Sequence, residues 1–454
     1  MHDIRKRVKE FTKKYGIDHE SIDMEINCRL FIEEMESGLS GRGSSLEMIP
    51  TYITMNDEIP VDEPVIVIDA GGTNFRTALV HFDCEKKPVI EDFNLHHMPG
   101  SKGEIGRDEF FETIAGYIRP LLHRSDKLSF CFSYPVEILP NRDGRLIRFT
   151  KEVKVRGLEG NLIGAGLADT LKRTGCADKK SIVMLNDTVA TLLGGKAAYP
   201  GRVFDSYMGL ILGTGTNTCY TEEMENITKI AGATDFSAGA VTADTGKSPM
   251  IVNIESGGYS RAPRGPIDDE FDNGTNNPGK YMFEKMISGA YQGGLFLVIV
   301  KKAAGEGLLS RDFSLGLKHV EALTSKDIDN FLYYQYSSSL GGILTDCCSA
   351  AGTTEGENDR KALYYLADAL IERAARLVAI NLTAVIMKTG RGKNPCAPVC
   401  IAADGTTFYK SKLFRTKLDY YVKTFMNEEK GIYCEFVKAD NATLLGTAIA
   451  GLTI

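Results

Sequence analysis

The chain has 454 residues, which at about 150 residues per domain predicts two or three structural units. Hydrophobic residues make up 43% and charged residues 25%, a composition that excludes disordered, collagen-like and coiled-coil chains. The net charge of −7 argues against general binding of nucleic acid or of an anionic membrane surface.

Apolar residues at helical spacing predict helix within the first 40 residues. We expect Asp18 or Ser21 to cap the longer helical segment, with Gly38 and Gly41 near its end. The apolar stripe of that segment comprises Ile22, Ile26, Leu30 and Met35.

Two units of strand, glycine turn and strand follow. A β-branched run at 65–68 ends in Asp69-Ala70-Gly71-Gly72-Thr73-Asn74, and a second apolar strand follows at 77–80. This order predicts a β-hairpin rather than the strand-to-helix turn of a dinucleotide fold. The pattern recurs at 208–220 around Gly213-Thr214-Gly215-Thr216-Asn217, which indicates two related α/β halves.

The rest of the chain alternates between strand and helix patterns. Strands are expected at 128–133, 181–185 and 398–402, and helices near 281–303, 325–338 and 359–387. This alternation predicts an α/β protein with a mixed or parallel sheet in each half. Residues 257–279 are rich in Gly, Pro, Asn and Asp and are predicted to form a long loop.

Nothing in the sequence predicts export or membrane insertion. The charged start contains no apolar signal-peptide core, and no run of about 18 apolar residues occurs. The apolar stretch 444–454 is expected to be a buried helix. The ten cysteines are scattered without a CxxC pair, which is typical of reduced thiols. We therefore expect a cytoplasmic protein that binds neither nucleic acid nor a membrane.

Glycine-bearing turns at 71–72, 213–215 and 405 each follow an apolar strand. Backbone N–H groups approach a phosphate closely where side chains are absent, so the three turns together predict a polyphosphate site. Thr73 and Thr214 add hydroxyl donors, and Asp69 is suited to hold Mg2+ through water. Any one of these turns taken alone is adequately explained as a tight hairpin. Neither a Walker A loop nor a dinucleotide fingerprint fits them.

Asp187 follows the strand 181–185, at the strand end where open α/β sheets bind their ligands. A carboxylate there can accept the proton of a substrate hydroxyl while the hydroxyl oxygen attacks a phosphorus. The same aspartate precedes an Ala-Thr-Leu-Leu stretch and would also serve as a helix N-cap. The residues alone support both interpretations equally.

Several further polar residues could bind a polyol, whose hydroxyl groups need neutral and carboxylate partners. For Lys151 and Glu284, a solvated surface charge is the simpler interpretation. The candidates are Ser133, Thr150, Lys151, Asn217, Glu255 and Glu284.

Taken together, these segments resemble the hexokinase family, within the superfamily of sugar kinases, Hsp70 and actin. The resemblance covers nearly the whole chain and rests on the order of the motifs. The segments that carry it are Asp69-Ala70-Gly71-Gly72-Thr73-Asn74-Phe75-Arg76, Phe132-Ser133-Tyr134-Pro135, Phe149-Thr150-Lys151, Leu185-Asn186-Asp187-Thr188-Val189, Gly213-Thr214-Gly215-Thr216-Asn217, Asn253-Ile254-Glu255, Phe283-Glu284-Lys285, Asp404-Gly405-Thr406 and Gly446-Thr447-Ala448.

The resemblance implies the two-lobed, actin-like ATPase (ribonuclease H-like) α/β fold, with mixed sheets flanked by helices and a cleft between the lobes. The implied small lobe comprises residues 62–185 together with a C-terminal helix at 441–454. The implied large lobe comprises residues 1–61 and 186–440.

The activity implied is that of a hexokinase, a phosphotransferase with an alcohol group as acceptor. It would transfer a phosphoryl group from ATP to the 6-hydroxyl of a hexose, as in the first step of glycolysis, with Mg2+ bound to the nucleotide. Glucose is the expected hexose, and mannose and fructose are the alternatives. We expect a monomer or a homodimer.

The family roles carry over to positions of this chain. Asp187 is the implied catalytic base, and Asp69 is implied to hold Mg2+ through water. The residues implied to bind the hexose are Ser133, Thr150, Lys151, Asn186, Asp187, Asn217, Glu255 and Glu284. The residues implied to bind ATP are Asp69, Gly71, Gly72, Thr73, Asn74, Arg76, Gly213, Thr214, Gly215, Gly405 and Thr406.

The chain departs from the family pattern around the expected sugar site. It has no tryptophan, so Phe149 and Ser256 stand at two positions where the family has tryptophan. Glu152 replaces a glycine, and Tyr134 replaces a phenylalanine. The ATP-side motifs match the family more closely.

Two other functions are compatible with parts of the pattern. A catalytically weak, hexokinase-like sugar sensor would have no need of Asp187. An actin-like ATPase would have no need of the sugar-type residues Asn217, Glu255 and Glu284.

Overall fold

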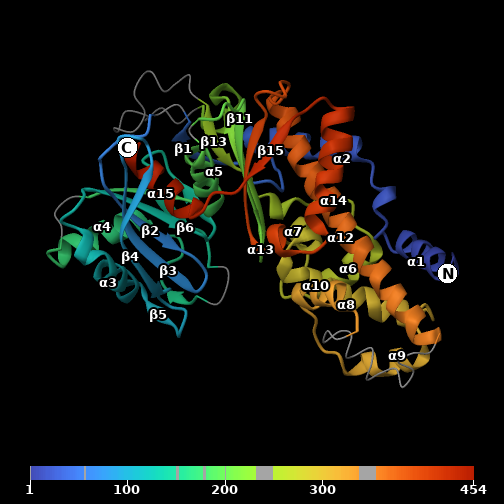
Figure 1. Cartoon of the computed structure of the whole chain (residues 1–454). Helices are drawn as coiled ribbons and strands as arrows, with labels where there is room; N and C mark the ends of the chain where they lie inside the picture. The colour runs from blue at the N-terminus through green and yellow to red at the C-terminus, as the bar shows by residue number, and fades with distance from the viewer. Residues whose placement is uncertain are drawn as a thin grey trace.

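The computed structural model describes residues 2–55, 58–149, 153–176, 180–199, 201–231, 249–336 and 354–453. Its strands form one six-stranded and one five-stranded sheet, with two small two-stranded sheets. Figure 1 shows the five-stranded sheet and a large group of helices on opposite sides of the six-stranded sheet.

The five-stranded sheet has the order β10-β6-β2-β3-β4. Its first three strands run parallel, and β3 and β4 are antiparallel to their neighbours, so the sheet is mixed. The strands are β2 (Val65–Ala70), β3 (Asn74–Phe82), β4 (Pro88–His97), β6 (Lys127–Phe132) and β10 (Ser181–Leu185). The hairpin predicted around Gly71 and Gly72 is confirmed by the antiparallel pairing of β2 and β3.

β2 is buried on both faces, which explains its unbroken β-branched run. Ile66 and Ile68 pack in the same core as α3 (Arg107–Ile118) and α4 (Ile163–Arg173). Val65 and Val67 point the other way, into a core shared with α5 (Asp187–Ala198) and α15 (Ala442–Leu452). The apolar chain end is therefore a buried helix, as predicted.

The six-stranded sheet has the order β1-β13-β12-β11-β14-β15. From β1 to β11, each strand is antiparallel to its neighbour. From β11 to β15, each strand is parallel to its neighbour, so this sheet is mixed as well. The strands are β1 (Ile49–Thr54), β11 (Ser206–Leu212), β12 (Thr216–Glu222), β13 (Met250–Asn253), β14 (Val399–Asp404) and β15 (Cys434–Val437). The second predicted hairpin, β11–β12, is confirmed.

Helices α5 and α15 cross between the two sheets at very short range (Figure 1). A Cβ atom on Gly446 would fall 1.7 Å from the Ala190 carbonyl oxygen, and one on Gly194 would fall 2.3 Å from the Ala442 carbonyl oxygen. Only glycine allows this approach. Asp187 at the start of α5 and Thr443 in the first turn of α15 line one cavity with Asp69 of β2 and Ser133, which follows β6.

The 36-residue helix α12 (Thr354–Thr389) lies at the centre of the group of helices and packs against α1, α2, α7, α8, α10 and α14. The shorter elements fill the space around it or link the sheets. They are α1 (His2–Lys14), α2 (Met24–Leu39), α6 (Pro266–Asn273), α7 (Met282–Ile287), α8 (Gly289–Gly305), α9 (Arg311–Gly316), α10 (Ser325–Tyr333), α13 (Thr406–Lys410), α14 (Phe414–Tyr421), β5 (Ile105–Gly106), β7 (Val136–Ile138), β8 (Gly144–Leu146), β9 (Val155–Arg156) and the π-helical turn Val422–Glu429.

The structure corrects the predicted face of α2. Asp23, not Asp18 or Ser21, caps this helix by accepting from the Ile26 N–H at 2.9 Å. Of the predicted stripe, Ile22 and Met35 are buried, whereas Ile26 is 47% exposed and Leu30 is half-buried. The buried side of the helix also carries Met24, Cys28 and Phe31. The predicted stripe was wrong in part because several residues of this segment are apolar, and packing against α12 decides which of them are buried.

The stretch predicted to be one long loop at 257–279 contains the helix α6. Pro266 occupies its first turn, and the Asp268 carboxylate accepts from the Gly265 N–H at 2.8 Å. Proline suits the first turn because the N–H that it lacks would have no partner there. In the stretches that the structure describes, no helix has the length and apolar character needed to cross a membrane.

Candidate active site

A cavity of about 290 Å³ opens where the two sheets approach each other. It is formed by the β2–β3 turn, the end of β6, the starts of α5 and α15, and the end of β14. Its lining residues are Asp69, Gly71, Gly72, Thr73, Asn74, Arg76, Ser133, Asp187, Ile211, Asp404, Gly405 and Thr443. We call it the phosphate-side cavity. It brings together the first predicted glycine turn, the predicted base Asp187 and Asp69, which was predicted to hold Mg2+ through water.

Asp69 is the second-last residue of β2 and is only 6% exposed. Its carboxylate forms an ion pair with Arg76 on the neighbouring strand, with Nη1 and Oδ2 3.0 Å apart. The two residues are direct partners in the β2–β3 register, which holds the guanidinium beside the carboxylate. Burial raises the pKa of Asp69, Arg76 lowers it, and the nearby Asp187 raises it again, with a net upward shift.

Asp187 is the first residue of α5, and its carboxylate is not the helix cap. Asn186 is the N-cap, and its side-chain oxygen accepts from the Thr188 N–H at 2.9 Å. The carboxylate of Asp187 accepts from the Thr188 hydroxyl at 3.3 Å and lines the phosphate-side cavity. Of the two interpretations that the sequence left open, the capping role belongs to the preceding residue.

A cluster of amides and carboxylates lies beside this cavity. Asn217 Nδ2 is 2.8 Å from Asn253 Oδ1, 3.1 Å from Glu255 Oε1 and 3.5 Å from Asn186 Oδ1. Glu255 has φ of 55°, a left-handed conformation that is costly for a residue with a side chain. Such strain persists only where the surroundings impose it, here at a point where four polar side chains converge.

The cluster borders a second, much smaller cavity, the sugar-side cavity, of about 10 Å³. It lies between β1 of one sheet and β7 beside the other. Its lining residues are Ile49, Thr51, Tyr134, Val136, Ile138, Asn186, Asn253 and Glu255. Asn186 therefore lies in its wall, and the next residue, Asp187, lies in the wall of the phosphate-side cavity.

Glu284 is a half-buried residue on α7, not a solvated surface charge. Its Oε2 accepts from the Thr216 N–H at 2.9 Å. A Cβ atom on Gly215 would fall 2.6 Å from the same oxygen, so the glycine leaves room for the carboxylate. Glu284 thus packs against the second glycine turn.

The second glycine turn (213–215) packs against the third (Gly405), but only the third lines the phosphate-side cavity. Gly405 lies in its wall, whereas residues 213–215 do not. The Thr407 hydroxyl donates to the Gly213 carbonyl oxygen at 2.9 Å and ties the two turns. Gly405 has φ of 118°, a conformation open to glycine, and a Cβ there would meet the Leu212 carbonyl at 2.2 Å.

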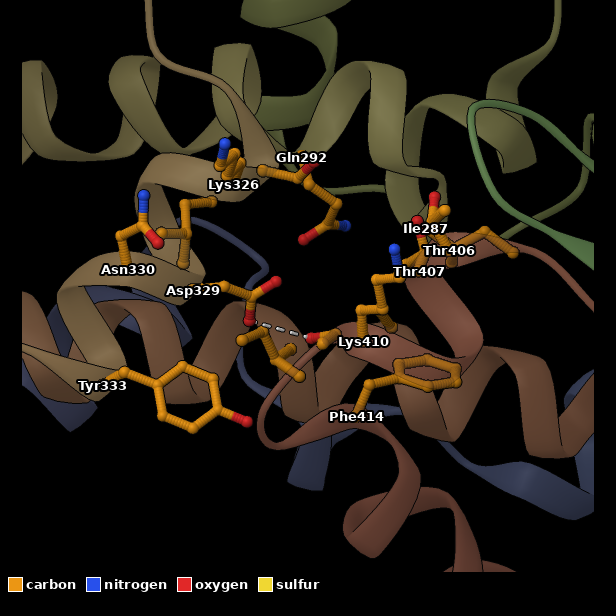
Figure 2. A pocket seen from close by; sticks show the side chains of 15 residues that line it. Ile287, Gln292, Lys326, Asp329, Asn330, Tyr333, Thr406, Thr407, Lys410 and Phe414 are labelled. Atoms are coloured by element: carbon orange, nitrogen blue, oxygen red, sulfur yellow. Dashed lines mark hydrogen bonds between the residues drawn. The ribbon is translucent and has the colours of Figure 1, made fainter.

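Thr406 lines a third, larger cavity of about 450 Å³, between α8, α10, α12, α13 and α14. Figure 2 shows Gln292 and Asp329 pointing toward its centre. Asp329 accepts from the Ser411 hydroxyl at 3.2 Å and from the Lys412 N–H at 3.0 Å, and burial raises its pKa. Gly405 lines the phosphate-side cavity and the next residue, Thr406, lines this one, so the walls of the two cavities meet at α13. We call it the nucleoside-side cavity.

Some candidate residues are not among the described residues, and some lining residues had no sequence signal. Thr150 and Lys151 fall outside the described residues, as does Glu152. Thr443 lines the phosphate-side cavity one helical turn before the buried Thr447 of the quoted motif. Of the residues predicted to bind ATP, Thr406 lines the nucleoside-side cavity, and the other residues of its wall were not predicted. One wall of this cavity does have a sequence signal: the Thr-x-x-Asp capping box at Thr324 and Asp327 marks the start of α10.

Comparison with known proteins places this arrangement in a family. A family model described as Hexokinase matches residues 207–453, more than half of the chain, and a second so described matches residues 7–197. The chain belongs to the hexokinase family. The resemblance found in the sequence motifs is therefore confirmed.

Curated hexokinases align along most of the chain. It is 28% identical to Hexokinase-2 of Equus caballus, with 99% of this chain and 48% of that protein covered. It is 26% identical to Hexokinase-1 of Nicotiana tabacum, with 97% and 89% covered. The chain spans about half the length of the mammalian hexokinases that it matches.

Solved hexokinase structures show the same fold. A hexokinase from Schistosoma mansoni, complexed with glucose, superposes with a TM-score of 0.76 at 23% identity, covering 100% of this chain and 99% of that chain. A second hexokinase crystal structure gives 0.72 at 20% identity, with 100% of both chains covered. The predicted two-lobed, actin-like fold with mixed sheets and flanking helices is confirmed.

Proposed function

We propose that this chain transfers the γ-phosphoryl group of ATP to the 6-hydroxyl of a hexose, with glucose as the first substrate to test. One observation carries the proposal. Asn186 and Asp187, adjacent in the chain, line two different cavities. One cavity has the donors suited to a polyphosphate, and the other has the amides and carboxylates suited to a polyol.

The chemistry follows from the placement of Asp187. Its carboxylate would take the proton of the 6-hydroxyl as that oxygen bonds to the γ-phosphorus. The bond from the γ-phosphorus to the bridging oxygen breaks, and ADP leaves with the electron pair. Phosphoryl transfer passes through a loose transition state, so alignment of the hydroxyl matters more than the strength of the base. Because Asn186 and Asp187 are adjacent at the start of α5, a hexose bound by Asn186 would have its 6-hydroxyl near the Asp187 carboxylate.

The residues of the phosphate-side cavity fit a nucleotide with its Mg2+. Asp69, Asp187 and Asp404 bring three carboxylates to its wall and Arg76 one guanidinium. Gly71 and Gly72 have no side chains to cover their peptide groups. In the described part of the chain, no group of three or more His, Cys, Asp or Glu side chains is arranged to hold a metal directly. Mg2+ that keeps its waters and uses the nucleotide's phosphates needs few carboxylates. When bound, it would neutralise charge on the phosphates, and Asp69 would hold it through water.

The nucleoside of ATP would occupy the nucleoside-side cavity. Thr406, which directly follows Gly405 of the phosphate-side cavity, lines the nucleoside-side cavity, and α13 forms part of its wall. A volume of about 450 Å³ lies within the range of small-molecule sites. Phosphates on the glycine turns and a nucleoside beyond Thr406 would then follow one continuous path.

Hexose binding requires the lobes to separate first. The sugar-side cavity, at about 10 Å³, has room for about one water molecule and none for a hexose. We propose that residues 62–185 with 441–454 form one lobe and that it moves relative to the rest, which parts β7 from β1. Closure onto the bound sugar would exclude water and limit hydrolysis of ATP.

The decisive experiment measures ADP release from MgATP with glucose, mannose, fructose and no sugar. We expect sugar-dependent release, with glucose tested first because the Schistosoma relative was solved with it. Equal release without sugar would instead indicate an actin-like ATPase. No release, together with a thermal shift on adding glucose, would indicate a sugar sensor.

The affinity for hexose is expected to fall as the pH drops below about 7. Burial, followed by the neighbouring carboxylates of Glu47, Asp187 and Glu284, raises the pKa of Glu255 to about 7. The ionised carboxylate accepts hydrogen bonds from sugar hydroxyls, and protonation removes part of that capacity. Below the pKa the dissociation constant should rise by up to about tenfold per pH unit.

Titration calorimetry with glucose between pH 5.5 and pH 8.5 would test this expectation. Glu255→Gln is the matched variant, since it keeps the shape and cannot ionise. Its affinity should be weaker than that of the wild type and flat across the range. A wild-type profile that is equally flat would contradict the assignment of the titration to this residue.

A further inference from the structure

Tyr134 connects the sugar-side cavity with the phosphate-side cavity. Its ring is buried against Phe132 and Phe149, with centroids 4.8 Å and 5.2 Å away, and it lines the sugar-side cavity. Its hydroxyl donates to the Gly71 carbonyl oxygen at 2.9 Å. One side chain thus contributes to the wall of one cavity and holds the backbone of the other.

The Gly71–Thr73 turn has few other constraints on its first peptide. The Gly71 N–H donates to the Asn74 carbonyl at 3.0 Å, and the Met98 N–H donates to the Thr73 carbonyl at 3.0 Å. Both bonds hold other peptide groups of the turn. Two consecutive glycines can rotate their shared peptide at little steric cost. The Tyr134 hydroxyl supplies a bond to that peptide.

The geometry of a peptide makes this bond consequential for a phosphate. The Gly71 carbonyl and the Gly72 N–H belong to one planar, trans peptide group and point in opposite directions. A bond that holds the oxygen toward Tyr134 therefore also fixes where the N–H points. Gly72 lines the phosphate-side cavity, where an N–H is the donor that a phosphate oxygen needs.

We propose that Tyr134 is a positioning residue that orients the Gly71–Gly72 peptide toward the phosphates of the nucleotide. The inference rests on the proposed function in taking this turn as a phosphate site and the cavity beside Tyr134 as the sugar site. It links the wall of the sugar-side cavity to the phosphate turn through a single side chain. The hexose that rests against this wall and the nucleotide would then be ordered by one hydrogen-bonded unit.

Tyr134→Phe tests the proposal because it removes the hydroxyl and keeps the ring. The probe is Mg2+ with the β,γ-imido analogue of ATP, titrated calorimetrically. We expect its dissociation constant to rise about two- to tenfold, the range for loss of one hydrogen bond. The dissociation constant for glucose without nucleotide should change less than twofold, because the ring still lines the cavity.

Tyr259→Phe is the matched control. Tyr259 is equally buried, and its hydroxyl has no hydrogen-bond partner among the described residues. This control loses the same atom and should bind the analogue as the wild type does.

Three outcomes would overturn the proposal. The first is a Tyr134→Phe affinity for the analogue equal to that of the control, and the second is an equal loss of glucose affinity, which would indicate a general structural role. The third is a wild type that does not bind the analogue. A wild type that binds the analogue but shows no hexose-dependent ADP release would refute the proposed function alone, and the ratio of affinities would still decide the role of Tyr134.

Discussion

Asp187→Ala is expected to lower kcat for hexose phosphorylation by about 10²–10⁴-fold, the usual range for loss of a general base. Hexose affinity should stay within about tenfold of the wild type, because the amide and carboxylate cluster around Asn217 remains. A loss of kcat with little change in binding is the signature of an interaction made mainly in the transition state. Steady-state assays of ADP release with titration of glucose would measure both quantities.

Asp108→Ala provides the matched control. Asp108 also lies in the first turn of a helix, α3, but is exposed and lies outside the cavities described above. Its loss removes the same charge from a helix N-terminus, so any general effect on helix stability would be common to both variants. A kcat for Asp187→Ala within tenfold of this control would exclude Asp187 as the base.

Asp268→Ala is expected to destabilise the folded protein by about 3–5 kcal/mol, the usual cost of breaking a buried ion pair. The Arg373 side chain is 0% exposed, and its Nη1 and Nη2 lie 2.7 Å from the two carboxylate oxygens of Asp268. Arg373 also donates to the Gly16 carbonyl at 3.0 Å. Removal of the carboxylate would leave a guanidinium charge buried between α6, α12 and the segment after α1.

Thermal unfolding followed by calorimetry would measure the effect as a fall in Tm of several degrees. Asp419→Ala is the control, because Asp419 pairs with Arg415 on the surface of α14 at 2.8 Å. Exposed pairs contribute about 0–1 kcal/mol, so this variant should unfold close to the wild-type Tm. Equal shifts in the two variants would contradict the importance of the buried pair.

Local patterns were sufficient for the strands and turns that form the phosphate side. The run at 65–68 is β-branched throughout because β2 is buried on both faces, and the glycines after it mark a hairpin. Both signals lie within a few residues of each other. The same holds for Asp187, whose place at a strand end follows from the apolar run before it.

Predictions were less reliable where they depend on the exact phase of a helix or on contacts with residues far away in the chain. The stripe of α2 was misplaced because several residues there are apolar and only packing against α12 selects the buried ones. The helix α6 was predicted as loop because eight residues rich in Asp and Asn look like turn sequence. Its stability depends in part on Asp268 meeting Arg373, 105 positions away in the chain.

The sequence by itself determined the fold class, the family and the order of the residues that we assign to phosphate and sugar. Only the tertiary structure decided which contacts each of these residues makes. It made Asn186 rather than Asp187 the helix cap, joined Glu284 to the second glycine turn, and set the Tyr134 hydroxyl on Gly71. The last two contacts join segments on different strands and helices, and their geometry is fixed by packing between elements, which no local pattern of residues records.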